Sequence, residues 1–148
     1  SFTGASRRFE YVGTKNGAKI FDDYAHHPTE IKATIEAATK MKYNKLWAVF
    51  QPHTFTRTKS LFNEFATAFY GIDNLIILDI YAAREIDDGT ISSKMLVEEI
   101  NKNSANCIHI STIEEVAEYL KNNLTANDLV LTIGAGTVTK IGYMIKEN

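Results

Sequence analysis

The stretch Ala18–Lys40 reads AKIFDDYAHHPTEIKATIEAATK and holds one strand, one polar junction and one helix in succession. Its first six residues form a short run of the kind found in buried strands. Its second half places Ile31, Ile35 and Ala38 on one helical face. Pro28 suits the first helical position because its missing N–H costs nothing there. A strand followed by such a helix is the repeating unit of a parallel α/β sheet.

The same alternation continues through the rest of the chain. We expect buried strands at Ala18–Asp23, Lys45–Phe50, Asn74–Ile80, Asn106–Ile110 and Asp128–Ile133. An additional strand, antiparallel or at an edge, is expected at Arg8–Val12. Further helices are marked by apolar stripes, which consist of Leu61, Phe65 and Phe69, of Ile113, Val116, Ala117 and Leu120, and of Val138, Ile141 and Ile145.

Two more helix starts can be located from side chains. Thr112 with Glu115 forms a capping box ahead of the stripe that begins at Ile113. The segment 92–101 supplies another helix, which opens near Ser92 or Ser93. We therefore predict a Rossmann-like α/β fold, a mostly parallel sheet of about six strands with helices on both faces. Residues 1–148 contain no internal linker and fit a single domain.

Composition and charge argue against several classes of protein. The formal net charge of -2 argues against nucleic acid or an anionic membrane as the main partner. No apolar run approaches the roughly 20 residues that a membrane-spanning helix needs. The single cysteine, Cys107, rules out an internal disulfide and fits a reducing compartment. We expect a cytoplasmic protein.

Unusual polar residues follow four of the expected strands. Their segments are Asp22–Pro28, Gln51–Thr58, Tyr81–Glu85 and Gly134–Thr137. Ligands of parallel sheets bind beyond the carboxyl ends of the strands, where helix N-termini present free N–H groups. We therefore expect three of the four histidines to lie at one edge of the sheet, together with Arg57 and Arg84. The fourth, His109, lies within a strand, and we interpret it as structural.

The polar residues of the first junction also have structural explanations. Asp22 and Asp23 could satisfy backbone donors at a strand end. His26 and His27 could form a surface turn. A metal held by Asp23, these two histidines and His53 is chemically feasible. No His-x-x-x-His or Cys-x-x-Cys spacing supports it, so we predict no metal site.

The other junctions point more clearly to an anion. Arg84 is explained by a surface ion pair with Glu85 or Asp87. Arg57 near a helix start is electrostatically unfavourable, and an anionic ligand would remove that penalty. Gly134–Gly136 lacks the third glycine of a dinucleotide fingerprint, but such a turn lets backbone N–H groups approach an anion. The chain has no Walker A loop, so its residues alone indicate an anion-binding α/β module.

The junction motifs together resemble a known family. Asp22–Ile31 is similar to the signature that opens the C-terminal domain of Mur ligases. The paired histidines with Pro28 and the segment Gln51–Thr58 narrow the resemblance to the members that join L-alanine to UDP-N-acetylmuramate. Ser6–Glu10 and Gly134–Gly136 are also similar to those members. The resemblance covers essentially the whole chain. One departure is Thr54, where some members carry an arginine.

The resemblance implies a three-domain enzyme of peptidoglycan synthesis. An N-terminal domain would hold the UDP-sugar, and a central domain would hold the Walker A loop and magnesium. We expect this chain to be the third domain, excised from that enzyme and inactive alone. ATP would convert the muramoyl carboxylate to an acyl phosphate, which the amine of L-alanine would attack. The resemblance also implies nucleotide contacts, with Asp23 accepting hydrogen bonds from the ribose hydroxyls and Tyr24 as a neighbouring wall.

The remaining roles implied by the resemblance concern the reacting groups. His26 matches a histidine near the reacting phosphates, where it would stabilise charge or orient alanine. His53 and Arg57 would hold the alanine carboxylate, and the backbone of Ala135 and Gly136 would line the same pocket. Two alternatives stay open: a ligase that reattaches a recycled murein tripeptide to UDP-N-acetylmuramate, and a free-standing module that binds a nucleotide or an amino acid.

Overall fold

The computed structural model describes residues 8–103 and 106–147, and within them the chain forms one six-stranded sheet. Its strand order is β1-β2-β6-β3-β4-β5. The strands are β1 (Glu10–Lys15), β2 (Ala18–Asp23), β3 (Leu46–Phe50), β4 (Asn74–Ile77), β5 (Cys107–His109) and β6 (Leu129–Ile133). The β1–β2 pair is antiparallel and the other pairs are parallel, so the predicted fold class is confirmed.

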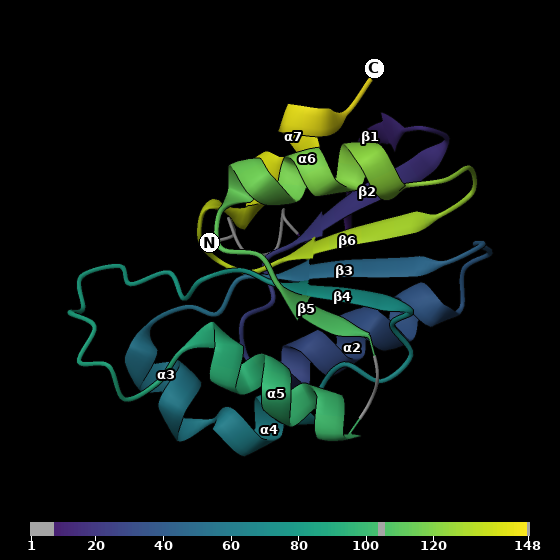
Figure 1. Ribbon diagram of the computed structural model, residues 1–148. Coiled ribbons are helices and arrows are strands. Elements are labelled where there is room, and N and C mark those ends of the chain that lie inside the picture. The colour runs from purple at the N-terminus through teal and green to yellow at the C-terminus, as the bar shows by residue number, and fades with distance from the viewer. Residues whose placement is uncertain (1–7, 104–105, 148) are drawn as a thin grey trace.

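Helices cover both faces of the sheet (Figure 1). One face carries α2 (Pro28–Thr39), α3 (Phe55–Ser60), α4 (Phe62–Ala66) and α5 (Ser93–Asn103). The opposite face carries α6 (Ile113–Asn123) and, after the short helix η1 (Thr137–Thr139), α7 (Lys140–Ile145). Each face has its own buried apolar cluster, because the strands of a parallel sheet are apolar on both sides.

The predicted strands are confirmed, with corrections at their ends. The additional strand is an antiparallel edge strand, but β1 begins at Glu10 and runs past Val12 to Lys15. A register irregularity between Tyr11 and Gly13 lets the pairing continue. β4 ends at Ile77 and not at Ile80, since Ile77 is its last residue paired with β3 and β5. Of the segment Ser6–Glu10, the first two residues lie outside the described part of the chain.

One predicted helix is wrong as a single element. The stripe Leu61, Phe65 and Phe69 was expected on one helix, but α3 ends at Ser60, Leu61 has non-helical φ and ψ angles, and Phe69 lies beyond the end of α4. Phe65 and Phe69 are still buried, with their rings 5.5 and 5.3 Å from the ring of Phe50. Phe65 and Phe69 therefore share a buried position because both contact Phe50 of β3, and not because they lie on one face of a single helix.

The other helix signals are confirmed, except that the stripe Val138, Ile141 and Ile145 is divided, because Val138 lies in η1 and the other two residues lie in α7. Pro28 is the first residue of α2, and the Thr112–Glu115 capping box is present at α6. His27 is the N-cap of α2 and forms a capping box with Glu30. α5 begins at Ser93. In the described residues no helix has both the length and the apolar character needed to cross a membrane.

Candidate functional site

The strand order brings three junctions together. β6 lies between β2 and β3, and all three strands run in the same direction. The segments that follow them, near residues 24–27, 51–54 and 134–136, therefore emerge side by side at one edge of the sheet (Figure 1). The segment after β4 joins them through a bridge between His53 and Tyr81. The predicted meeting of the junctions at this edge is confirmed.

His53 lies at the centre of this edge. Its ring is stacked on Tyr81, with centroids 5.3 Å apart and an interplanar angle of 26°. The ring of His26 lies on another side, 6.3 Å away, and itself makes an edge contact with Tyr24 at 5.2 Å. His26 is oriented by the Tyr24 carbonyl oxygen, 3.1 Å from its Nδ1. Three of the predicted site residues are thus in one row of rings.

Two buried nitrogen atoms here have no hydrogen-bond partner among the described residues. They are Nδ1 of His53 and Nη1 of Arg57. A buried donor without a partner costs about 1–3 kcal/mol, so such atoms call for an explanation. Burial lowers the pKa of His53, and the charges of Arg57 and His26 lower it further, although Glu85 acts in the opposite direction. At neutral pH Arg57 therefore supplies the positive charge, and a neutral His53 can supply an N–H.

The helix that carries Arg57 is held at its start by two side chains. The hydroxyl of Thr54 accepts from the Arg57 N–H at 3.3 Å. Glu85 accepts from the N–H groups of Phe55 and Thr56 at 2.6 and 3.0 Å, and its hydrogen bonds with Thr56 are the main reason its pKa is low. An ion pair between Arg84 and Glu85 or Asp87 is not formed within the described residues. Glu85 instead caps this helix, and Oδ1 of Asp87 accepts from the Gly89 N–H.

The two aspartates at the end of β2 do satisfy donors of the chain. Both are buried. Asp22 accepts from the hydroxyls of Thr132 and Thr139 at 2.6 and 2.9 Å. Asp23 accepts from the backbone N–H groups of Ala25 at 2.8 Å and Phe9 at 3.0 Å. Its Oδ1 also lies 3.5 Å from the Nε of Arg8. The expected role of satisfying backbone donors is therefore confirmed for Asp23, whereas Asp22 accepts from threonine hydroxyls. A ribose contact by Asp23 would come in addition.

The glycine of the last junction permits a close approach. A Cβ atom on Gly136 would lie 2.6 Å from Oε1 of Gln51 and 2.9 Å from Cγ of Tyr81. Gln51 is buried and joins the second junction to the last, since its Nε2 donates to Thr137 Oγ1 and its Oε1 accepts from Val138 N–H. A polar residue directly after an apolar strand could have revealed Gln51. No local signal marks Tyr81, because its partners come from distant segments.

The other two histidines stay outside this cluster of rings. His27 caps α2, where its Nδ1 accepts from Thr29 N–H at 3.3 Å. His109 pairs with Asp79, with 2.6 Å between Nε2 and Oδ1, as expected of a structural residue. Within the described residues no group of three or more His, Cys, Asp and Glu side chains is placed to hold a metal ion.

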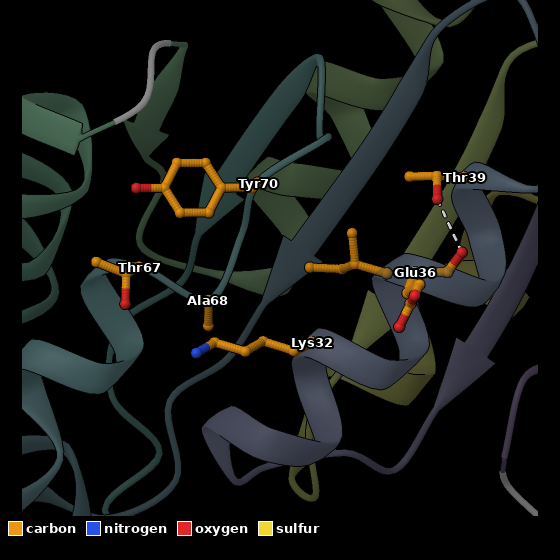
Figure 2. A pocket seen from close by; sticks show the side chains of 7 residues that line it. Lys32, Glu36, Thr39, Thr67, Ala68 and Tyr70 are labelled. Carbon is orange, nitrogen blue, oxygen red and sulfur yellow. Dashed lines mark hydrogen bonds between the residues drawn. The ribbon is translucent and has the colours of Figure 1, made fainter.

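Two surface hollows accompany the site. One of about 630 Å³ lies against α3 and is lined in part by Phe55, Lys59 and Arg84. The other, of about 460 Å³, is lined by α2 and the segment before β4 (Figure 2). None of the predicted site residues lines the second hollow, whose walls are Lys32, Ile35, Glu36, Thr39, Thr67, Ala68 and Tyr70. Neither hollow is lined by His53 or Arg57, so we define the site by the row of rings together with Arg57.

The lowered pKa of His53 makes the stability of the chain depend on pH. The unfolded imidazole titrates near 6.5 and the folded one below it, so acidification favours the unfolded state. We expect wild-type chain to lose stability relative to His53→Gln as pH falls through about 6.5 and until the folded group is protonated. Urea unfolding of both proteins at a series of pH values measures this. Parallel stability curves would contradict it.

Comparison with known proteins gives consistent matches. A family model described as "Mur ligase, glutamate ligase domain" matches residues 7–136. A UDP-N-acetylmuramate--L-alanine ligase from Clostridium acetobutylicum is 53% identical over 144 residues, which are 97% of this chain and 31% of that relative. The chain thus spans about a third of the length of the curated relatives it matches.

Solved structures share the fold. The UDP-N-acetylmuramate-alanine ligase of Thermotoga maritima matches with a TM-score of 0.72 and 22% identity, over 94% of this chain and 29% of that chain. A murein peptide ligase from Psychrobacter arcticus matches with a TM-score of 0.77 and 21% identity, over 94% and 29%. At these identities the likeness shows the architecture alone.

Proposed function

Because this chain belongs to the Mur ligase family, we propose that it is the C-terminal domain of a cytoplasmic, ATP-dependent ligase of peptidoglycan synthesis. The whole enzyme joins L-alanine to UDP-N-acetylmuramate. The UDP-sugar is held by an N-terminal domain, and the ATP phosphates with magnesium are held by a central domain. Both domains lie outside these 148 residues. The support is the 53% identity to a relative that carries the name of this activity.

One observation supports the placement of the amino acid. Nδ1 of His53 and Nη1 of Arg57 are buried and unpartnered among the described residues, at the edge where ligands of parallel sheets bind. A carboxylate has two oxygens and can accept from both nitrogens. We therefore assign the carboxylate of L-alanine to this pair. The backbone of Ala135 and Gly136, on the neighbouring junction, lines the same pocket.

The other site residues are assigned to ATP. Asp23 receives the ribose hydroxyls, and Tyr24 forms the adjacent wall. A carboxylate offers about four acceptor positions, so the three contacts that Asp23 already makes leave room for a further donor. His26, one ring away from His53, faces the reacting phosphates. Magnesium, when bound, neutralises phosphate charge, and we assign it to the central domain.

The proposed reaction has two steps, phosphoryl transfer and amide formation. The γ-phosphoryl group of ATP passes to the muramoyl carboxylate, which gives an acyl phosphate and ADP. The amine of L-alanine, after losing a proton, attacks the acyl carbon, so that a C–N bond forms and the C–O bond to phosphate breaks. With its carboxylate fixed by Arg57 and His53, the amine is held in position for attack. A domain that closes only over bound substrates also excludes water.

The murein-tripeptide alternative has weaker support. The solved structures do not separate the two activities, since the murein peptide ligase from Psychrobacter arcticus and the alanine ligase from Thermotoga maritima are 21% and 22% identical to this chain. The support for L-alanine comes from curated relatives that carry its name at 53%, 52% and 53% identity.

The division of labour between domains can be tested directly. We expect this 148-residue chain alone to release no phosphate from ATP with L-alanine and UDP-N-acetylmuramate, since it has no Walker A loop. The full-length ligase that contains it should release one phosphate per amide bond formed. Phosphate release and product are measured together. Alanine-dependent release by the chain alone, or a full-length enzyme that prefers the tripeptide, would refute the proposal.

A further inference from the structure

Tyr81 lies where three junctions of the site meet. Its N–H donates to the Pro52 carbonyl at 2.8 Å, and its carbonyl accepts from the Thr54 N–H at 2.8 Å. These two bonds enclose His53, whose backbone forms the isolated bridge with Tyr81. The segment after β4 is thereby tied to the segment after β3. Sequence reasoning gave Tyr81 no role.

The last junction packs closely against the ring of Tyr81. Gly136 packs so closely that a Cβ atom there would lie 2.9 Å from Cγ and 3.1 Å from Cδ1 of the ring. The imidazole of His53 is stacked on the same ring. Among the residues that the structure describes, none makes a hydrogen bond to the Tyr81 hydroxyl. Tyr81 therefore contributes to this site through the face of its ring, which contacts His53, and not through its hydroxyl.

His53 needs such a support. The torsion that turns an imidazole about its Cβ–Cγ bond has a broad energy profile, so the direction of Nδ1 is not fixed by rotamer preference. Nδ1 has no hydrogen-bond partner in the described residues to hold it. The ring of His26 is tilted by 54° to that of His53, whereas the ring of Tyr81 is nearly parallel to it. Stacking on Tyr81 is therefore the contact that restrains rotation of the His53 ring.

We propose that Tyr81 is the positioning residue that holds the His53 imidazole with Nδ1 directed at the carboxylate of the incoming amino acid. This rests on the proposed function for the identity of the ligand. The contact between the rings is independent of it. Tyr81 itself touches no reacting atom and acts through His53.

The first test uses the 148-residue chain and requires no activity. The imidazole resonances of His53 are followed by NMR against pH in wild type, Tyr81→Phe and Tyr81→Ala. Phenylalanine keeps the stack, so its titration should match wild type. Alanine exposes the imidazole to water and should move its pKa upward, since burial is the main cause of its low value, ahead of the charges of Arg57, His26 and Glu85. An unchanged titration in Tyr81→Ala overturns the proposal.

The second test measures amino-acid use in the full-length ligase. Tyr81→Ala should raise the KM for L-alanine roughly three- to tenfold, the factor that an aromatic pair contributes, with the KM for ATP unchanged. Tyr81→Phe should behave as wild type. If Tyr81→Phe is as impaired as Tyr81→Ala, the hydroxyl matters and the proposal fails. If Tyr81→Ala does not fold, Tyr81→Leu, which keeps bulk without a flat face, takes its place in both tests.

The two tests also separate the inference from the proposed function. A pKa shift of His53 without any change in the KM for L-alanine overturns the carboxylate assignment, and leaves the contact between the two rings established.

Discussion

Replacing Arg57 by lysine should lower kcat/KM for L-alanine at least about tenfold in the full-length ligase and leave the KM for ATP unchanged. A guanidinium holds a carboxylate with two parallel hydrogen bonds, whereas an ammonium acts as a point charge. The loss of one charge-assisted hydrogen bond, about 1.5–3 kcal/mol, gives this factor. Arg57→Met removes both bonds and the charge, so its loss should reach roughly 100-fold.

Although Arg57→Met should lower activity, it should raise the stability of the free chain. Nη1 of Arg57 is buried without a partner in the described residues. The charge of Arg57 also lowers the pKa of His53. Arg57→Met removes this unsatisfied donor, and we expect the free energy of unfolding to rise by about 1 kcal/mol. A gain in stability with a loss of activity distinguishes a ligand-binding cation from a structural one.

Steady-state kinetics with L-alanine varied at saturating ATP, and then the reverse, measures the first effect, and urea unfolding of the chain measures the second. Lys59→Gln is the matched control, because Lys59 lies on the same helix and is exposed, and among the described residues its side chain makes a hydrogen bond only to Thr90. A loss confined to the ATP parameters would place Arg57 on phosphate and refute our alanine pocket.

Asp23→Ala should destabilise the chain by roughly 2–4 kcal/mol. It leaves the N–H groups of Ala25 and Phe9 without an acceptor and removes the ion pair with Arg8. In the full-length ligase, loss of the ribose contact should also raise the KM for ATP, with a 10- to 100-fold loss in kcat/KM and a smaller effect on L-alanine.

Asparagine variants of the two adjacent aspartates provide the control. The partners of Asp23 are backbone N–H groups, which can only donate, so the amide of Asp23→Asn cannot replace both acceptors. The partners of Asp22 include hydroxyls, which can rotate, and Thr132 Oγ1 already lies 3.5 Å from the Phe21 carbonyl. Chemical unfolding should therefore show a larger loss for Asp23→Asn than for Asp22→Asn. Normal ATP kinetics in folded Asp23→Ala would leave Asp23 with its structural role alone.

The order of elements could be predicted from the sequence because its signals are local. Buried strands and amphipathic helices follow from the repeat of the backbone, so Ile31 and Ile35 were correctly placed in the core. Capping is also local, since Thr112 and Glu115 are three residues apart. The site junctions followed from the rule for parallel sheets, which needs only the positions of the strand ends.

Local signals failed where distant segments decide the structure. The stripe containing Leu61 predicted one helix, but packing of Phe65 and Phe69 on Phe50 is compatible with two short ones. The kink at Thr54, with φ of 68°, is held by the Tyr81 carbonyl and supports the start of α3. Periodicity carries no information on such a contact.

By itself, the sequence determined the α/β class, the junctions that carry the polar residues and the resemblance to one family. Only the tertiary structure decided that β6 lies between β2 and β3, and that His53 is stacked on Tyr81 within the electrostatic influence of Arg57. The physical reason is the separation along the sequence of the residues that interact. Burial patterns depend on residues close together in the sequence, whereas the partners of a polar side chain depend on which strands become neighbours in the sheet. The unpartnered nitrogens of His53 and Arg57 could be recognised only after those neighbours were known.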